Sequence, residues 1–132
     1  MSRLSERIEN FDRVFLLFKQ VKNAYQSDMS NDIYKLALTQ SFEIVFELGW
    51  KVLKDRLSAK GIDVYAPKDV IKESFAINIL PNAQIWIDML KDRNSSMHEY
   101  NQQKVDLIID SIASVYFSEL ENFHNEIKGW ND

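Results

Sequence analysis

The sequence predicts an all-α protein, an antiparallel, up-and-down bundle of about five helices. Apolar residues recur every three or four positions over most of the chain, the spacing that gathers them on one face of a helix. Only three Gly and two Pro occur among 132 residues, too few for the many tight turns of a β-sandwich or barrel. Apolar residues make up 45% and aromatic residues 12%, enough to form a core. By length, residues 1–132 are expected to form one domain.

Two long helices are expected in the first half of the chain. Over 4–25 the apolar positions step by three and four, and they are Leu4, Ile8, Phe11, Phe15, Phe18, Val21 and Tyr25. The segment SDMSND offers several N-cap residues, so a second helix is expected over about 32–59. This helix is apolar around most of its circumference, which predicts burial on several sides. Gly49 in its middle costs about 1 kcal/mol relative to Ala, so we expect another helix to approach it closely.

Gly and Pro residues divide the rest of the chain into three helices. Gly61 is expected just beyond the end of the second helix, and Pro67 at the first position of a short helix over about 67–76. Pro81 is expected to open a fourth helix, and a long last helix is expected over about 101–128. The residues expected to face inward are Val70, Ile71, Phe75, Ile85, Trp86, Met89, Leu90, Val105, Ile108, Ile109, Ile112, Tyr116, Leu120, Phe123 and Ile127.

Composition and charge exclude several classes of function. The chain has no Cys, so neither a disulfide nor a thiolate metal site can form, and with two His we expect no metal site and no cofactor. Its first residues are charged and hold no long apolar run, so we expect no signal peptide, no membrane association and a cytoplasmic location. The net charge of −4 argues against a general RNA-binding module, because such modules neutralise phosphates with basic surfaces.

The stretch KDRNSSMHEYNQQ interrupts the apolar spacing with a run of polar side chains. Arg93 offers a planar fork of donors suited to a phosphate, and His98 can move a proton near neutral pH. Asn94 could orient His98 or donate to a phosphate oxygen, and Ser95 and Ser96 could assist. Two interpretations stay open from these residues alone. One is a site that acts on a phosphate; the other is a polar loop with Arg93 near a helix C-terminus and an exposed His.

The segment DRNSSMHEY resembles the signature of the HEPN superfamily. Its ribonuclease members carry an Arg, a polar residue, a His after four to six intervening residues, and a Tyr two positions later. Arg93, Asn94, His98 and Tyr100 match this pattern. The segments SFEIVFELGWKVLKDRL, APKDVIKESF and IWIDMLKDRN are similar to helices of one branch. That branch comprises nucleotidyltransferase substrate-binding proteins, or HepT-type toxins paired with a minimal nucleotidyltransferase.

The resemblance implies a homodimer in which Arg93 and His98 of both copies line one cleft that cleaves RNA without a metal ion. Cleavage requires deprotonation of the 2′-hydroxyl, charge stabilisation at phosphorus and protonation of the leaving oxygen. The resemblance also implies that the nucleotidyltransferase transfers AMP to Tyr100, adding negative charge that excludes RNA. From the residues alone, Tyr100 could equally be an aromatic half-packed on the bundle. The acidic charge makes a tRNA or a small RNA end an easier substrate than mRNA in general.

Three functions remain open from the sequence. The first is an endoribonuclease toxin in which Arg93, His98 and Asn94 are catalytic and Tyr100 is the site of AMPylation. The second is a non-catalytic subunit that binds a nucleotide or substrate and forms a complex with the minimal nucleotidyltransferase. The third is an interaction protein without a nucleotide ligand. The intact motif favours the first function over the second, and the acidic charge favours the second.

Other polar residues have structural interpretations. His124 on the last helix is expected to be exposed to solvent. Glu43 and Glu47 are four positions apart and could bind a metal, but an ion pair between Glu47 and Lys51 on the helix surface is the favoured interpretation.

Overall fold

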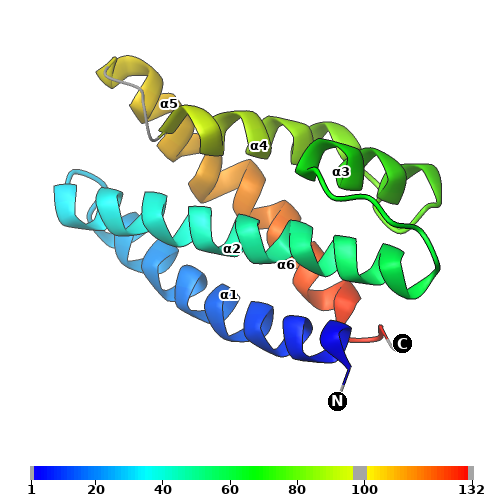
Figure 1. The fold of residues 1–132 in the computed structure, drawn as a ribbon. Helices are drawn as coiled ribbons and strands as arrows, with labels where there is room; N and C mark the ends of the chain where they lie inside the picture. Colours follow the sequence, from blue (N-terminus) through cyan, green and yellow to red (C-terminus); the bar gives the residue numbers. More distant parts are fainter. Residues whose placement is uncertain (1, 97–100, 131–132) are drawn as a thin grey trace.

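The computed structural model describes residues 2–96 and 101–130, and the helices of this part of the chain confirm the predicted all-α bundle (Figure 1). The elements are α1 Arg3–Ser27, α2 Asp32–Ala59, α3 Pro67–Ala76, α4 Ala83–Ser96, α5 Gln102–Ser111, the π-helical segment η1 Ile112–Tyr116 and α6 Phe117–Ile127. The last three follow one another without a break and form one long helical run. The described residues therefore form five separate helical segments. None of these described helices is long and apolar enough to cross a membrane.

The helices pack as an antiparallel bundle. Figure 1 shows α1 and α2 side by side as a hairpin, with α6 crossing beneath them and α3 and α4 along the other side of α2. The N-terminus and the end of α6 lie at one end of the bundle, whereas the end of α4 and the start of α5 lie at the other end. The described residues of the polar stretch, 91–96 and 101–103, are therefore at the end of the bundle far from both termini.

Capping residues explain where α2 and α3 begin and end. The side chain of Asn31, within SDMSND, accepts the backbone N–H of Tyr34 at 3.1 Å and starts α2. Gly61 follows the C-cap of α2 with a φ of 83°, and its N–H donates to the carbonyl of Ser58 at 2.9 Å. Pro67 is the first residue of α3, where no N–H is needed. These three predictions are confirmed.

Gly49 lies where three helices meet. A Cβ atom at this position would lie 3.2 Å from Cη2 of Trp86 on α4 and 3.3 Å from Cε2 of Phe11 on α1. Both aromatic side chains are fully buried, and Trp86 Nε1 donates to Glu119 Oε2 of α6 at 3.1 Å. The predicted close approach to Gly49 is confirmed, and it involves rings from both neighbouring helices.

The start of α4 differs from the prediction. Pro81 lies in the turn before the helix, and α4 begins at Ala83. The side chain of Asn82 accepts the backbone N–H of Ile85 at 3.3 Å, so a capping side chain and not the proline sets the first turn.

The inward face of α3 also differs from the prediction. Val70, Ile71 and Ser74 are buried, whereas Phe75 is 51% exposed. The buried arc of α3 is therefore centred on Ser74. Phe75 is one residue further around the helix and lies at the solvent edge.

One side of α2 is exposed, contrary to the prediction that its neighbours surround it. Ile33, Leu36 and Ile44 are 75%, 60% and 53% exposed. These three residues, here called the α2 stripe, lie in the first half of α2, within about 80° of one another around the helix axis. No described helix of this chain covers them, because the residues that α2 buries lie on other sides of its axis.

His124 is buried, so the expectation of a solvated histidine is wrong. Its side chain is 8% exposed, and its ring stacks on Phe15 of α1 with the ring centres 4.5 Å apart. Its Nε2 lies 2.6 Å from Oδ1 of Asp12. Because α6 packs against α1, this position faces a neighbouring helix and takes an aromatic and a carboxylate partner from it.

Candidate functional site

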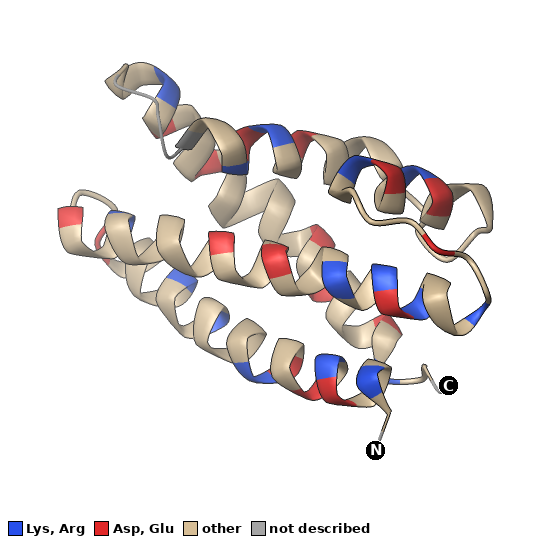
Figure 2. Cartoon of the chain, viewed as in Figure 1, with Lys and Arg blue, Asp and Glu red and all other residues tan. Residues whose placement is uncertain are grey.

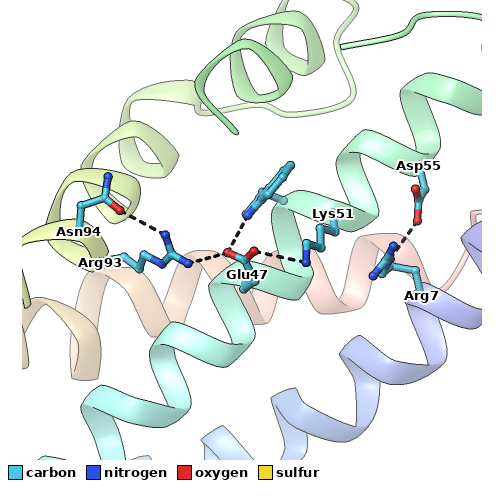
Figure 3. A network of polar contacts seen from close by, with 7 residues as sticks. Arg7, Glu47, Lys51, Asp55, Arg93 and Asn94 are labelled. Atoms are coloured by element: carbon cyan, nitrogen blue, oxygen red, sulfur yellow. Dashed lines mark hydrogen bonds and ion pairs between the residues drawn. The ribbon is translucent and has the colours of Figure 1, made fainter. Parts of the chain in front are cut away.

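Arg93 and Asn94 lie in the last turn of α4, where Arg93 reaches across to α2. Its Nη2 donates to Oε2 of Glu47 at 2.9 Å, and its Nη1 donates to Oδ1 of Asn94 at 3.2 Å (Figure 3). The Arg93 side chain remains 30% exposed. Because the Glu47 carboxylate binds one edge of the Arg93 guanidinium, it limits the motion of that group and orients it for binding an anion.

Glu47 is the centre of this polar network. Its Oε2 also accepts Nε1 of Trp50 at 3.0 Å, and its Oε1 lies 3.3 Å from Nζ of Lys51 (Figure 3). Burial on its own would raise the pKa of Glu47. The hydrogen bonds from Trp50 and Lys51, with the charges of Arg93 and Lys51, outweigh it and hold that pKa below its ordinary value. Glu47 is therefore an ionised acceptor at neutral pH.

The predicted ion pair between Glu47 and Lys51 is confirmed, but the sequence did not predict that Arg93 joins it. No cluster of three or more metal-ligating side chains occurs among residues 2–96 and 101–130, so nothing described supports a metal at Glu43 and Glu47. The i,i+4 spacing predicted a partner for Glu47 within α2. Nothing in the local sequence indicated a second partner, Arg93, 46 residues away.

Asp92, directly before Arg93, is held by a different element. Its Oδ2 accepts the hydroxyl of Tyr116, at the end of η1. Burial raises the pKa of Tyr116 above its ordinary value, and the hydrogen bond to Asp92 and the negative charges of Asp92 and Asp88 raise it further. The phenol therefore remains a donor at neutral pH. The helical spacing predicted Tyr116 in the core but did not predict this contact.

The structure brings together some of the predicted site residues. Arg93 and Asn94 are in contact, Ser95 is half-buried in the same turn, and Ser96 is the last residue of α4. His98 and Tyr100 lie outside the described residues, so their catalytic and modification roles stay predictions.

The long last helix begins close to its predicted start. Asn101 is the N-cap of α5, and its side chain accepts the backbone N–H groups of Gln103 at 2.9 Å and Lys104 at 3.4 Å. The predicted motif therefore begins in the last turn of α4, and the N-cap of α5 directly follows its last residue in the sequence.

Charges around the site are mixed. Figure 2 shows Lys and Arg interspersed with Asp and Glu along α4 and along the second half of α2. On α4, Arg93 and Lys91 are accompanied by Asp88 and Asp92. An RNA bound here would meet few uncompensated cations, so its affinity would depend on a small number of contacts.

Comparison with known proteins decides the family. Residues 6–129 match the family described as nucleotidyltransferase substrate binding protein like. The chain belongs to this family. One relative is the protein named Probable ribonuclease HepT from Haemophilus influenzae, 27% identical over 84 residues, which are 60% of this chain and 58% of the relative. The match therefore spans less than two thirds of that relative.

Two solved structures share the fold of this family member. A crystal structure of a protein from Thermus thermophilus has a TM-score of 0.77 and 22% identity, covering 89% of this chain and 98% of that one. The tri-AMPylated HEPN toxin of Shewanella oneidensis, in complex with MNT antitoxin, has a TM-score of 0.78 and 14% identity, covering 98% and 100%. The predicted HEPN-like fold and its nucleotidyltransferase-linked branch are confirmed.

Proposed function

We propose that this chain is the toxin of a HEPN–nucleotidyltransferase toxin–antitoxin pair, and that it is an endoribonuclease acting in the cytoplasm without a metal ion or cofactor. One observation carries the proposal: the partly exposed side chain of Arg93, whose guanidinium is held by Glu47, lies at the start of the residues that match the HEPN signature. A preoriented donor stabilises developing charge without reorganising during the reaction. Similarity to the H. influenzae protein and to the fold of the S. oneidensis toxin supports this assignment.

In this proposal Arg93 and His98 carry out the reaction, and Asn94, Ser95 and Ser96 assist them. Arg93 donates to the non-bridging oxygens of the scissile phosphate. His98 of one subunit takes the proton of the 2′-hydroxyl, whose oxygen then bonds to phosphorus and displaces the 5′-oxygen. His98 of the second subunit gives a proton to that leaving oxygen. The Oδ1 atom of Asn94 accepts from Arg93, which leaves the amide nitrogen to donate to phosphate or to His98. Ser95 and Ser96 are supporting residues.

The test is expression of the chain alone, wild type beside His98→Ala, with growth and RNA integrity measured. Wild type should arrest growth, and the variant at equal soluble level should not. Purified wild type should cleave RNA, tRNA included, at the same rate with and without a chelator. Normal growth with the wild type would contradict the toxin assignment, and loss of cleavage in chelator would contradict the metal-independent mechanism.

A homodimer is part of the proposal because one His98 cannot serve as both base and acid. The α2 stripe supports it: the stripe is exposed and apolar, and Ile44 is three residues before Glu47, on the adjacent part of the helix surface. A second copy covering the stripe would lie beside Arg93.

We expect Leu36→Asp to convert the dimer to a monomer and to reduce cleavage, because a buried carboxylate at an apolar interface is costly. Light scattering gives the mass of each species. Leu17→Asp is a matched control, since Leu17 is 54% exposed on α1 and outside the stripe. Retention of the dimer by Leu36→Asp would exclude the stripe as the interface.

A minimal nucleotidyltransferase is the proposed partner, and Tyr100 is its proposed target. In the presence of the partner and ATP, wild type should gain AMP and lose RNA cleavage, because the added phosphate repels RNA. Tyr100→Phe should gain no AMP and remain active, as intact-mass spectrometry and cleavage assays would show. Tyr65→Phe is the control, since Tyr65 is 72% exposed beyond α2. Full AMPylation of Tyr100→Phe would exclude Tyr100 as the target.

A second candidate function is a non-catalytic subunit that binds nucleotide or substrate for the nucleotidyltransferase. The family description, the net charge of −4 and the engagement of Arg93 by Glu47 favour it. It predicts partner-dependent nucleotide binding, with no RNA cleavage and no growth arrest by the chain alone.

A further inference from the structure

The last helical run shifts its register at η1. Ile112 is buried four positions after Ile108 and three positions after Ile109, and buried residues again recur every three or four positions along α6. Between Ile112 and the buried pair Tyr116 and Phe117, the steps are four and five. A π-helical turn contains about one residue more than an α-helical turn, so it accommodates this longer step, and such segments are frequent at functional sites. Tyr116, at the end of η1, and Phe117, at the start of α6, are both buried.

The two aromatic residues contact different helices. The ring of Phe117 stacks on Phe15 of α1 with centres 5.7 Å apart. The ring of Tyr116 stacks on Phe42 of α2 with centres 5.6 Å apart and planes 16° apart. Stacking fixes the plane of the Tyr116 ring, and its hydroxyl reaches Asp92 of α4. Tyr116 therefore connects the last helical run to α2 and to the final turns of α4.

Asp92 and Arg93 are consecutive residues of α4 and point about 100° apart around its axis. Asp92 is bonded to Tyr116, and Arg93 is bonded to Glu47 of α2. The buried side chains of Trp86 and Met89 fix the body of α4, and these two contacts from neighbouring positions hold its last turns against two different elements.

We propose that Tyr116 is a positioning residue for Arg93: by holding Asp92, it fixes the rotation of the last turn of α4 so that the Arg93 guanidinium meets Glu47. The inference relies on the proposed function only for what Arg93 then does. Burial and the bond to Asp92 raise the pKa of Tyr116, which keeps the hydroxyl protonated and able to donate at neutral pH.

A double-mutant cycle on stability tests the inference without any assay of activity. Tyr116→Phe keeps the ring on Phe42 and removes the hydroxyl, and Glu47→Gln weakens the partner of Arg93. If Tyr116 orients Arg93, the change that the double variant makes in the unfolding constant in urea should differ by more than about threefold from the product of the two single changes. Additive effects, within about twofold, would overturn the inference.

Three further variants keep the cycle interpretable. Tyr25→Phe with Glu47→Gln should be additive, since Tyr25 is a buried tyrosine whose charged neighbours are Asp106 and Asp110 of α5. If Tyr116→Phe does not fold, Asp92→Ala replaces it in the cycle with the same expected coupling. Asp92→Asn keeps an oxygen that can accept from the Tyr116 hydroxyl. In an Asp92→Asn background the coupling between Tyr116→Phe and Glu47→Gln should therefore match the coupling in wild type. Loss of that coupling would count against the inference.

Activity separates this inference from the proposed function. If the chain cleaves RNA, Tyr116→Phe should lower kcat by about ten- to a hundredfold, since small displacements of a catalytic group have effects of this size. An unchanged kcat beside an inactive Arg93→Ala variant would overturn the positioning role and leave the proposed function standing. A coupled cycle in a chain that never cleaves RNA would support the positioning role and reject the proposed function.

Discussion

Replacing Arg93 with alanine is expected to abolish growth arrest and to lower RNA cleavage by about a hundred- to a thousandfold. This is the usual effect of removing one preoriented donor to developing charge. The fold should persist, because Arg93 is 30% exposed at a helix end and Glu47 keeps its bonds from Trp50 and Lys51. The lost ion pair should cost about 1 kcal/mol or less. Cleavage of labelled RNA, with circular dichroism as the check on folding, measures both effects.

Lys91→Ala is the matched control for this variant, since it removes one positive charge from an exposed position two residues earlier on α4. It should retain nearly full cleavage. Arg93→Lys should recover only part of the activity, because an ammonium cannot replace the planar fork. Wild-type cleavage by Arg93→Ala would exclude Arg93 from catalysis and favour the substrate-binding function.

Replacing Trp86 with alanine is expected to be the most destabilising of these substitutions, at about 3–5 kcal/mol. Trp86 is fully buried, its ring contacts Phe46 and Phe123, and it lies against Gly49. Its Nε1 donor to Glu119 would also be lost. A domain is typically stable by about 5–15 kcal/mol, so the variant should be near the limit of folding. Urea unfolding followed by circular dichroism measures the change.

Trp86→Phe separates the ring from the N–H group. It keeps an aromatic side chain near Gly49 and loses the hydrogen bond to Glu119, so a smaller cost of about 1–3 kcal/mol is expected. In that background Gly49→Ala should be better tolerated than in wild type, because the smaller ring relieves the closest contact of the Cβ atom and leaves Phe11 Cε2, at 3.3 Å, as the neighbour that must adjust. A cost below about 1 kcal/mol for Trp86→Ala would mean that this part of the core is not well packed.

Local sequence signals predicted most of the fold. Gly61 and Pro67 marked real helix boundaries because each residue acts on its own backbone conformation. Pro81 and Phe75 misled because their roles depend on neighbours: Asn82 provides the cap, and the rotation of α3 against the bundle decides which residue is buried. Periodicity shows that a helix has an apolar face, but it does not show how far around the helix the neighbours extend.

The site was predicted only in part, for the same physical reason. The motif around Arg93 is contiguous in sequence and could be found there. Glu47 and Tyr116 contact it from elements far along the chain, and each had a sufficient local explanation, as an i,i+4 ion pair and as a core aromatic. His124 was expected to be exposed because its local sequence gave no sign of a partner. Its burial follows from the packing of α6 on α1.

The bond from Trp50 to Glu47 gives the candidate site its own optical reporter. The indole Nε1 of Trp50 donates to the carboxylate oxygen that Arg93 also contacts, and Nζ of Lys51 lies 6.0 Å from the centre of the indole ring. Indole emission responds to hydrogen bonding and to nearby charge. An anion that draws Arg93 away from Glu47 should therefore change the fluorescence of Trp50, most clearly in a chain whose other two tryptophans, Trp86 and Trp130, are replaced by phenylalanine. Binding of RNA or nucleotide could then be followed by titration, without a label and without cleavage.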